Sequence, residues 1–383
     1  MAGIQKGCAR WRMGSPVALF AVYAVMAIPD GIGVMAARFG MVDSASTLVF
    51  LWFAVLPIAA GKLCGGIGGR RAVAISLALA MSAFALLWRG TPQSALAATG
   101  FAVAGIANVM LQTTVPVWAA ELFGTVRLPG ALTAGLFVKT TVAVGLPFAV
   151  ATLAVAGDWR MLFPIFAVIT AAAVCMVWRG GPKPDSLHAS HADAVSWRSV
   201  GALLKDSPTA LVAIAFAVAV IADIAFNLSV PAAVSSRFGG GDVETGLTYA
   251  VLFGIKLPTM FFGSMLFARK GVTPFFMPAL VTSVAGAFAL FLAGTFHVYL
   301  CGVALFAFGY ANMYGFVYGV AAPRHPGAIS SVSTLLTMSI AGGALASPLV
   351  EALEPYSSRS TEALVFALTV ALFGLFASVR RKT

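Results

Sequence analysis

The chain has 383 residues, of which 60% are hydrophobic and only 10% are charged, and its mean hydropathy is +0.95. A soluble core does not need so apolar a composition, and too little chain remains for a separate catalytic lobe, so we expect no enzyme activity. The net charge of +11 does not indicate a nucleic-acid partner, because the 24 Lys and Arg residues lie mostly in short connections between apolar stretches and form no basic stripe.

A helix that crosses a bilayer needs about 20 apolar residues. By that measure the sequence predicts an all-α integral membrane protein with twelve transmembrane helices. We place them at roughly 16–39, 46–66, 71–89, 95–119, 129–156, 160–178, 207–232, 244–268, 273–294, 297–321, 328–350 and 361–379. The distribution of Lys and Arg favours cytoplasmic termini. We therefore expect a multi-pass protein surrounded by the lipids of the cell inner (plasma) membrane.

Four charged residues lie within these apolar stretches: Asp30, Lys139, Asp223 and Lys256. A charge near the bilayer centre costs a few kcal/mol, so such residues usually face a watery cavity, find partners and mark a substrate or proton path. This pattern predicts a transporter. Two interpretations of the charges stay open: static salt bridges between helices, or aspartates that take up and release a proton as a lysine partner arrives or leaves.

Polar side chains in the same stretches could bind a small polar solute, because amides donate and accept hydrogen bonds and aromatic rings cover apolar faces. The alternative for each is a hydrogen bond that holds two helices together. Together with Lys139 and Lys256, the candidate binding residues are Asn108, Gln112, Asn227, Tyr310, Asn312 and Tyr314. The pairs Asn108 and Gln112, Asp223 and Asn227, and Tyr310 and Tyr314 are each four residues apart, which predicts a shared helix face.

A polar segment rich in Gly, Pro and Ser interrupts the spans and divides them six and six. It predicts three parts: an N-terminal six-helix bundle (1–178), a cytoplasmic linker (179–206) with a short amphipathic helix near 197–204, and a C-terminal six-helix bundle (207–383). Short runs recur 204 residues apart, at 83–86 and 287–290 and at 107–108 and 311–312. We infer two pseudo-symmetric bundles. His188 and His191 in the linker have no further ligand nearby, so no metal site is expected.

The connection between the second and third spans, Gly61 to Arg71, resembles the signature loop of the major facilitator superfamily. It has the glycines and the basic cluster, but Gly65 stands where the family carries an acid. The resemblance implies the major facilitator fold, with two six-helix halves that rock about a central site. It also implies a gating role for Arg70 and Arg71.

Four stretches are similar to the fucose-permease-like sugar:proton symporters of that superfamily. They are Pro29-Asp30, 105–112, 137–139 with 158–166, and 223–227 followed by Pro231. The resemblance implies a monomer that imports a monosaccharide together with protons and needs no cofactor beyond the proton gradient. It assigns proton coupling to Asp30 and, by its similar setting, to Asp223.

Three departures from that family leave the substrate open: Leu136 replaces a polar residue, helix four lacks an acid, and Lys256 stands where relatives have arginine. Lys139 and Lys256 would also suit an organic anion. A proton-driven efflux antiporter ranks third, because helix five has Gly145-Leu146-Pro147 in place of the Gly-Pro motif of that class. A receptor that transports nothing ranks fourth.

Overall fold

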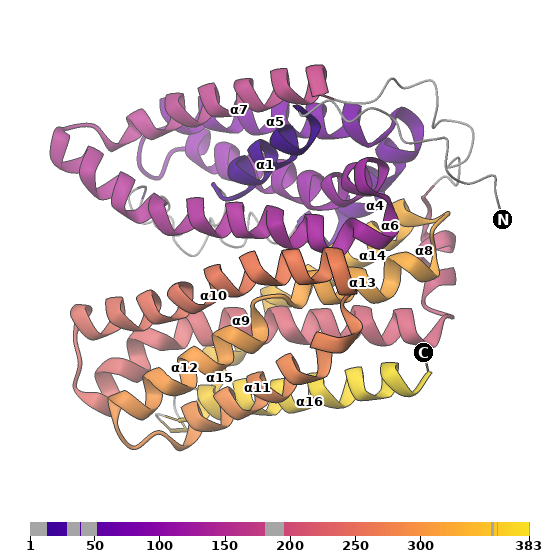
Figure 1. The fold of residues 1–383 in the computed structure, drawn as a ribbon. Coiled ribbons are helices and arrows are strands. Elements are labelled where there is room, and N and C mark those ends of the chain that lie inside the picture. The colour runs from indigo at the N-terminus through magenta and orange to yellow at the C-terminus, as the bar shows by residue number, and fades with distance from the viewer. Residues whose placement is uncertain are drawn as a thin grey trace.

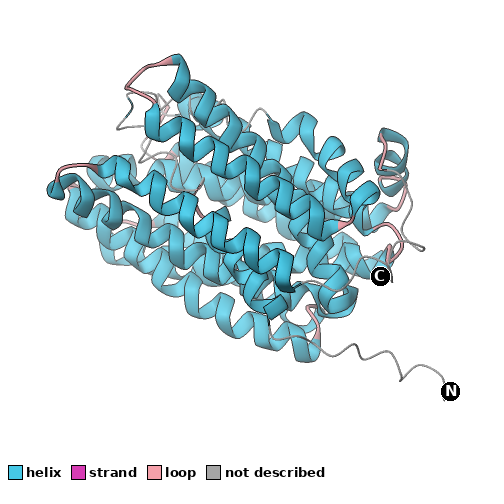
Figure 2. Cartoon of the chain, turned by 90° about the horizontal axis from the view of Figure 1, so that it is seen from above, coloured by secondary structure: helices cyan, strands magenta, loops and turns pink. Residues whose placement is uncertain are grey.

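The computed structural model describes residues 14–28, 39, 52–180, 195–353, 356–357 and 359–382, which form helices and connecting turns (Figure 2). Asp30 and much of the predicted 16–39 span lie outside these residues. The helices before the linker are α1 (Gly14–Met26), α4 (Trp52–Ile67), α5 (Gly69–Arg89), α6 (Ala95–Ala156), η2 (Trp159–Met161) and α7 (Leu162–Gly180). The others are α8 (Trp197–Leu203), α9 (Ser207–Phe238), α10 (Asp242–Lys270), α11 (Thr273–Leu292), α12 (Phe296–Tyr310), α13 (Met313–Arg324), α14 (Ile329–Ser339), η4 (Ile340–Leu345), α15 (Ala346–Leu353) and α16 (Ser360–Lys382).

Local signals in the sequence set the helix ends. Ser94 and Thr295 precede α6 and α12, and the hydroxyl of each accepts a hydrogen bond from the backbone N–H three residues later, a group that the helix itself leaves free. Gly239 ends α9 with a φ of 65°, a left-handed conformation that glycine adopts without steric cost. The predicted linker helix near 197–204 is confirmed as α8, which Ser196 and Ser199 cap reciprocally.

Nine helical segments in the described part of the chain are long and apolar enough to cross a membrane, and 16–26 and 52–67 form shorter apolar helices. The 62 residues of α6 would extend about 93 Å at ~1.5 Å per residue, roughly three times the hydrocarbon core. At Gly124 the backbone leaves the helical region, with a φ of 73° and a ψ of 161°. α6 therefore consists of two helices, in agreement with the spans predicted at 95–119 and 129–156.

The helices form two groups on either side of a central plane (Figure 1). α1 and α4–α7 make up the N-terminal group, and α9–α16 make up the C-terminal group. The short helix α8 lies at one end of the molecule, which we call the linker side, and the opposite end is the far side. Across the plane, α10, α13 and α14 contact α4 and α6.

The contacts between the groups are close because glycines remove side chains at the crossings. A Cβ built on Gly130 of α6 would lie 2.9 Å from the backbone oxygen of Ser264 in α10. A Cβ on Gly315 of α13 would overlap the Thr133 hydroxyl of α6, and one on Gly61 of α4 would overlap the Thr334 hydroxyl of α14. These crossings lie in the linker-side parts of the helices, so the groups are packed tightly on that side.

The linker takes part in this packing. Val195 is fully buried, and its methyl groups would lie 3.0 and 3.2 Å from a Cβ on Gly61, beside Thr334. α8 then follows along α14, where the Ser331 hydroxyl donates to the Ser199 hydroxyl at 3.2 Å. Val195 and α8, the part of the linker that the structure describes after residue 194, thus pack against the contact between the groups on the linker side.

Two of the predicted spans are interrupted. The 297–321 span is divided into α12 and α13 by a turn at Ala311 and Asn312, and the 328–350 span contains the 3-10 segment η4 between α14 and α15. A 3-10 stretch inside a helix often marks a hinge. In both spans the linker-side piece, α13 or α14, contacts the N-terminal group. The interruptions therefore separate the part of each span that contacts the N-terminal group from the rest of it.

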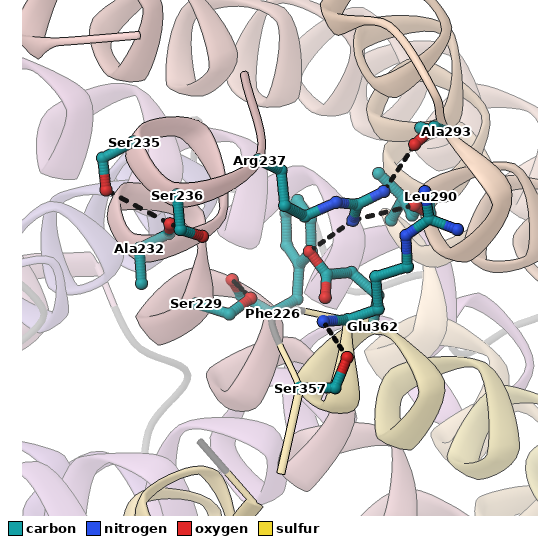
Figure 3. A network of polar contacts seen from close by, with 11 residues as sticks. Phe226, Ser229, Ala232, Ser235, Ser236, Arg237, Leu290, Ala293, Ser357 and Glu362 are labelled. Atoms are coloured by element: carbon teal, nitrogen blue, oxygen red, sulfur yellow. Dashed lines mark hydrogen bonds and ion pairs between the residues drawn. The ribbon is translucent and has the colours of Figure 1, made fainter. Parts of the chain in front are cut away.

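A buried polar network joins α9, α11 and α16 on the far side (Figure 3). The Arg237 guanidinium donates to Glu362 Oε1 at 2.9 Å and to the carbonyl oxygens of Leu290 and Ala293 at 3.3 and 2.6 Å. Both side chains of the ion pair are almost fully buried. Because α11 ends at Leu292, Arg237 satisfies carbonyl groups that the end of that helix leaves free. Sequence analysis did not find this pair.

Candidate functional site

An ion pair inside the C-terminal group forms the centre of the candidate site. Lys256 Nζ of α10 donates to Asp223 Oδ1 of α9 at 2.8 Å, and the two side chains are 8% and 30% exposed. α9 and α10 are consecutive in the chain and contact each other, which brings residues 33 positions apart into hydrogen-bonding range. This charge-assisted bond largely neutralises two groups that would be costly to bury alone.

Polar neighbours on the same helices fix the aspartate. Asn227 Nδ2 donates to the backbone oxygen of Asp223 at 2.7 Å and approaches its Oδ1 at 3.4 Å. The Tyr249 hydroxyl of α10 donates to the Asn227 backbone oxygen at 2.8 Å. The shared face predicted for Asp223 and Asn227 is thus present, and Tyr249 adds a second link from α10 to α9.

Aromatic rings hold the lysine from the other side. The Lys256 ammonium lies 5.4 Å from the centre of the Tyr310 ring, within the range of a cation–π interaction. Tyr310 stacks on Phe306 with centroids 5.4 Å apart, and Phe306 packs on Phe226 of α9 at 5.2 Å. This series of contacts starts at Asp223 of α9, passes through Lys256, Tyr310 and Phe306, and ends at Phe226, one turn further along α9. The site is therefore closely packed on this side.

Two buried amides occupy equivalent positions in the 204-residue repeat. Asn108 and Asn312 are 6% and 8% exposed, and the side-chain oxygen of each has no hydrogen-bond donor among the described residues. Asn312 Nδ2 donates to the Thr259 carbonyl oxygen at 3.3 Å, and the amide lies directly over Gly263 of α10. In this state Asn312 holds the turn between α12 and α13 against α10, and its oxygen can still accept a bond.

Tyr314 lies beyond that turn, so it does not share one continuous helix with Tyr310. The prediction that these two tyrosines share a face of one helix is therefore wrong. The Tyr314 ring packs edge-on against Phe216 at 5.7 Å and contacts the Tyr318 ring at 4.9 Å.

In the N-terminal group, Tyr23 of α1 is buried against Gly135 of α6, and its hydroxyl has no partner among the described residues. Sequence analysis did not select Tyr23, because a single tyrosine in an apolar helix gives no signal.

The remaining predicted residues differ in setting. Lys139 and Gln112 are buried in α6. Asp30 lies outside the described residues. Arg70 packs over the Trp178 ring of its own group, 5.7 Å from the ring centre, and Arg71 is exposed. The structure therefore joins Asp223, Asn227, Lys256 and Tyr310 into one contact network, and places the two arginines away from it.

Glu121 was missed by sequence analysis. Its Oε1 accepts a hydrogen bond from the Gly69 backbone N–H at 3.0 Å, at the first residue of α5. A carboxylate there is favoured by the helix dipole. Gly65 stands where the signature loop normally has its acid, and Glu121 supplies a carboxylate at the end of that loop from a distant part of the sequence.

Comparison with known families identifies the class of protein. The family model described as Major Facilitator Superfamily matches residues 15–348. The chain belongs to this superfamily. It is therefore an integral membrane transporter for small molecules and has no enzymatic role. The predicted membership, all-helical fold and transporter class are confirmed.

Solved structures agree with this fold. The chain is similar to a variant of the E. coli fucose:proton symporter FucP, with a TM-score of 0.81 and 14% identity over 96% of this chain and 98% of that one. It is also similar to the human organic anion transporter TETRAN (TM-score 0.72, 13% identity, 95% and 99% covered) and to the proton:xylose symporter XylE (0.70, 12%, 96% and 95%). No curated protein matches the sequence. At these identities the likeness shows the fold alone.

Proposed function

We propose that the chain is a proton-coupled symporter that imports a small neutral polyhydroxylated solute of the monosaccharide class by alternating access. Twelve spans would form two six-helix bundles, 1–178 and 207–383, joined by the linker 179–206. The protein would lie in the inner membrane of the cell, with both termini in the cytoplasm. The linker side is then the cytoplasmic side, and its tight packing corresponds to a transporter closed toward the cytoplasm.

We choose a neutral solute because the buried amide oxygens of the candidate site lack hydrogen-bond donors among the described residues, whereas Lys256 already has a partner. Lys256 is already bonded to Asp223, so its charge is not offered to an anion. The buried oxygens of Asn108 and Asn312 need donors, and sugar hydroxyls are donors whereas carboxylates are not. Tyr310 and Tyr314 supply ring faces of the kind that cover the apolar side of a sugar.

The same ion pair supports coupling to protons. Protonation of Asp223 removes the charge that holds Lys256, and loss of the proton restores the pair. Asp223 is 30% exposed, so the aspartate is more open to its surroundings than Lys256, which is 8% exposed. Asp30 remains the second proposed coupling residue, and Lys139 the second cation.

An organic anion is the alternative substrate, and the proposed protonation of Asp223 favours it. When Asp223 is protonated, Lys256 becomes available to a carboxylate, and Lys139 is a further cation buried in the N-terminal group. TETRAN, described as an organic anion transporter, has the same fold. The two substrates predict opposite effects of the same substitutions.

Isothermal titration with purified variants separates them. For a neutral sugar, Asn108→Ala and Gln112→Ala should each weaken binding roughly three- to tenfold, because a bond between neutral groups contributes about 0.5–1.5 kcal/mol. Asn312→Ala should do the same, and Lys256→Gln should have a smaller effect. Gln93→Gly, in the exposed turn between α5 and α6, is the control. A loss with Lys256→Gln well above the amide losses would reject the sugar and favour the anion.

A further inference from the structure

A hydrogen-bonded chain crosses from the C-terminal group to the N-terminal group beside the candidate site. The Tyr318 hydroxyl of α13 lies 3.0 Å from the Ser333 hydroxyl of α14. Ser333 Oγ in turn donates to the Thr113 carbonyl oxygen of α6 at 2.7 Å. All three residues are fully buried, so no water competes for these bonds.

The direction of each bond follows from the number of hydrogens. Ser333 has one hydroxyl hydrogen, and the Thr113 carbonyl can only accept, so that hydrogen points to Thr113. Ser333 must then accept from Tyr318, which donates. Tyr318 therefore orients the serine hydroxyl toward the opposite group, and a donor of this kind also strengthens the next bond in the chain.

This link is short compared with the other side-chain hydrogen bonds between the groups that we describe. Thr334 reaches the Pro57 carbonyl only at 3.4 Å, and its hydroxyl has a closer acceptor at 2.8 Å within its own helix. Thr140 meets the Met260 sulfur at 3.7 Å, and sulfur is a weak acceptor. The bond from Ser333 is thus the well-formed one, and it lies among the glycine crossings of the linker side.

Tyr318 is also in contact with the candidate site. Its ring lies against the Tyr314 ring, which packs on Phe216 of α9. The Tyr318 ring thus contacts Tyr314, a candidate binding residue, and its hydroxyl belongs to the contact between the groups. Tyr314 and Tyr318 both lie in α13, beyond the turn at Ala311 and Asn312 that separates α13 from α12.

We propose that Tyr318 is a positioning residue for alternating access: it orients Ser333 to bond Thr113 and so holds the linker side closed. Alternating access requires this closure to break and reform, and the proposed function rests on that cycle. Removing the Tyr318 hydroxyl should therefore change the balance between closed and open states, with little change in packing because the ring is kept.

The test measures the distance between the groups on the linker side. Spin labels at exposed Arg127 of α6 and exposed Lys270 of α10, in a chain whose four cysteines are replaced by alanine, report opening by double electron–electron resonance in nanodiscs. Tyr318→Phe should raise the ratio of open to closed molecules roughly three- to tenfold, the value of one neutral hydrogen bond. Ser333→Ala should do the same.

Tyr299→Phe is the matched control. Tyr299 is also fully buried in the C-terminal group, but its hydroxyl has no hydrogen-bond partner among the described residues, so its removal should leave the distances unchanged. Tyr318→Phe combined with Ser333→Ala should open the linker side no further than Ser333→Ala alone, because both act on one bond. The proposal is wrong if Tyr318→Phe behaves like Tyr299→Phe, or if the two effects add. The distances do not depend on the solute, so a failure to transport sugar would leave this result intact.

Discussion

Two buried ion pairs in the C-terminal group have different surroundings, and this difference predicts different roles. Lys256 and Asp223 meet beside a break in a helix, and the aspartate is 30% exposed. Arg237 and Glu362 are 4% and 2% exposed, and the arginine also bonds two carbonyl groups. The first pair is partly open to its surroundings, whereas the second is enclosed. We therefore propose a functional role for the first pair and a stabilising role for the second.

The first pair should show strong coupling between its two members. Lys256→Ala leaves the Asp223 carboxylate without its cation, which for fully buried pairs costs about 3–5 kcal/mol and should cost less here because of the partial exposure. Adding Asp223→Asn should recover much of that loss. Thermal unfolding of both single variants and the double variant in detergent measures the recovery. Equal, additive losses would contradict a direct pair.

The second pair should affect stability far more than a similar acid elsewhere. Glu362→Gln leaves Arg237 buried without its anion, so the expected loss in the free energy of unfolding is about 3–5 kcal/mol. Glu351→Gln is the control, because Glu351 is exposed and bonds only Ser347 among the described residues, and it should change stability by no more than about 0.5 kcal/mol. Similar melting temperatures for the two variants would show that the network in Figure 3 contributes little.

At this scale the sequence predicted residue types better than partners. Asp223 and Lys256 stood out because charges are rare in apolar stretches, and the contact of Asp223 with Asn227 followed from helical spacing. The pairing of Asp223 with Lys256 depends on how two helices cross, which no local pattern contains. Tyr318 and Ser333 are ordinary residues of apolar helices until the two groups of helices meet.

At the scale of elements, the glycine crossings should control which side of the molecule is closed. Gly61→Ala would put a methyl group into the Thr334 hydroxyl and the Val195 side chain, so α4 and α14 should separate. Gly66→Ala, on the same helix, meets nothing within 4 Å and should be neutral or slightly stabilising.

A cysteine in place of the fully buried Val195, in a chain without other cysteines, reports this separation. Its reaction rate with a maleimide should increase in the Gly61→Ala variant and stay unchanged in the Gly66→Ala variant. Equal rates in the two would mean that the crossing at Gly61 does not hold the linker side closed.

The start of α9 predicts a specific pH dependence. Hydrogen bonds from Arg324 are the main reason why the pKa of Asp206 lies well below its usual range, and Thr209 and His325 contribute further bonds. A carboxyl whose pKa is lowered by folding stabilises the protein above its ordinary value, near 3.9, and loses this effect as the pH falls further. Asp206→Asn should therefore cost up to about 1 kcal/mol at neutral pH, the range of exposed ion pairs.

The melting temperatures of wild type and Asp206→Asn should differ by the same amount from about pH 7 to pH 5 and converge only in stronger acid. Convergence already between pH 7 and pH 5 would mean that Asp206 titrates in its ordinary range or that another group causes the effect.

Helix positions were largely predictable, since length and hydropathy mark spans and Ser, Thr and Gly mark their ends. The interruptions were not. Ala311 and Asn312 separate α12 from α13 without a proline at the turn, and at the turn Asn312 bonds Thr259 of another helix, a contact that no local pattern contains. Gly342 and Gly343 in η4 were a usable signal, because paired glycines weaken a helix.

For the whole molecule, the two groups of helices are in close contact on the linker side through α4, α6, α10, α13 and α14, and Val195 and α8 pack against this contact (Figure 1). The candidate site lies where α12 passes into α13, next to the elements that make the contact. In the proposed function, solute binding and closure would therefore involve the same piece of chain. The two-group arrangement was expected from the internal repeat, but which side is closed depends on side-chain contacts between the groups.

Solute accumulation in proteoliposomes tests the proposed function most directly. With an inward proton gradient imposed, we predict that a labelled monosaccharide such as L-fucose or D-xylose accumulates above its external concentration and that a protonophore abolishes the accumulation. Asp223→Asn should lose accumulation but retain exchange of labelled for unlabelled sugar. Accumulation of a labelled monocarboxylate with none of the sugars, or sugar uptake that is the same with and without the gradient, would contradict a proton-coupled sugar symporter.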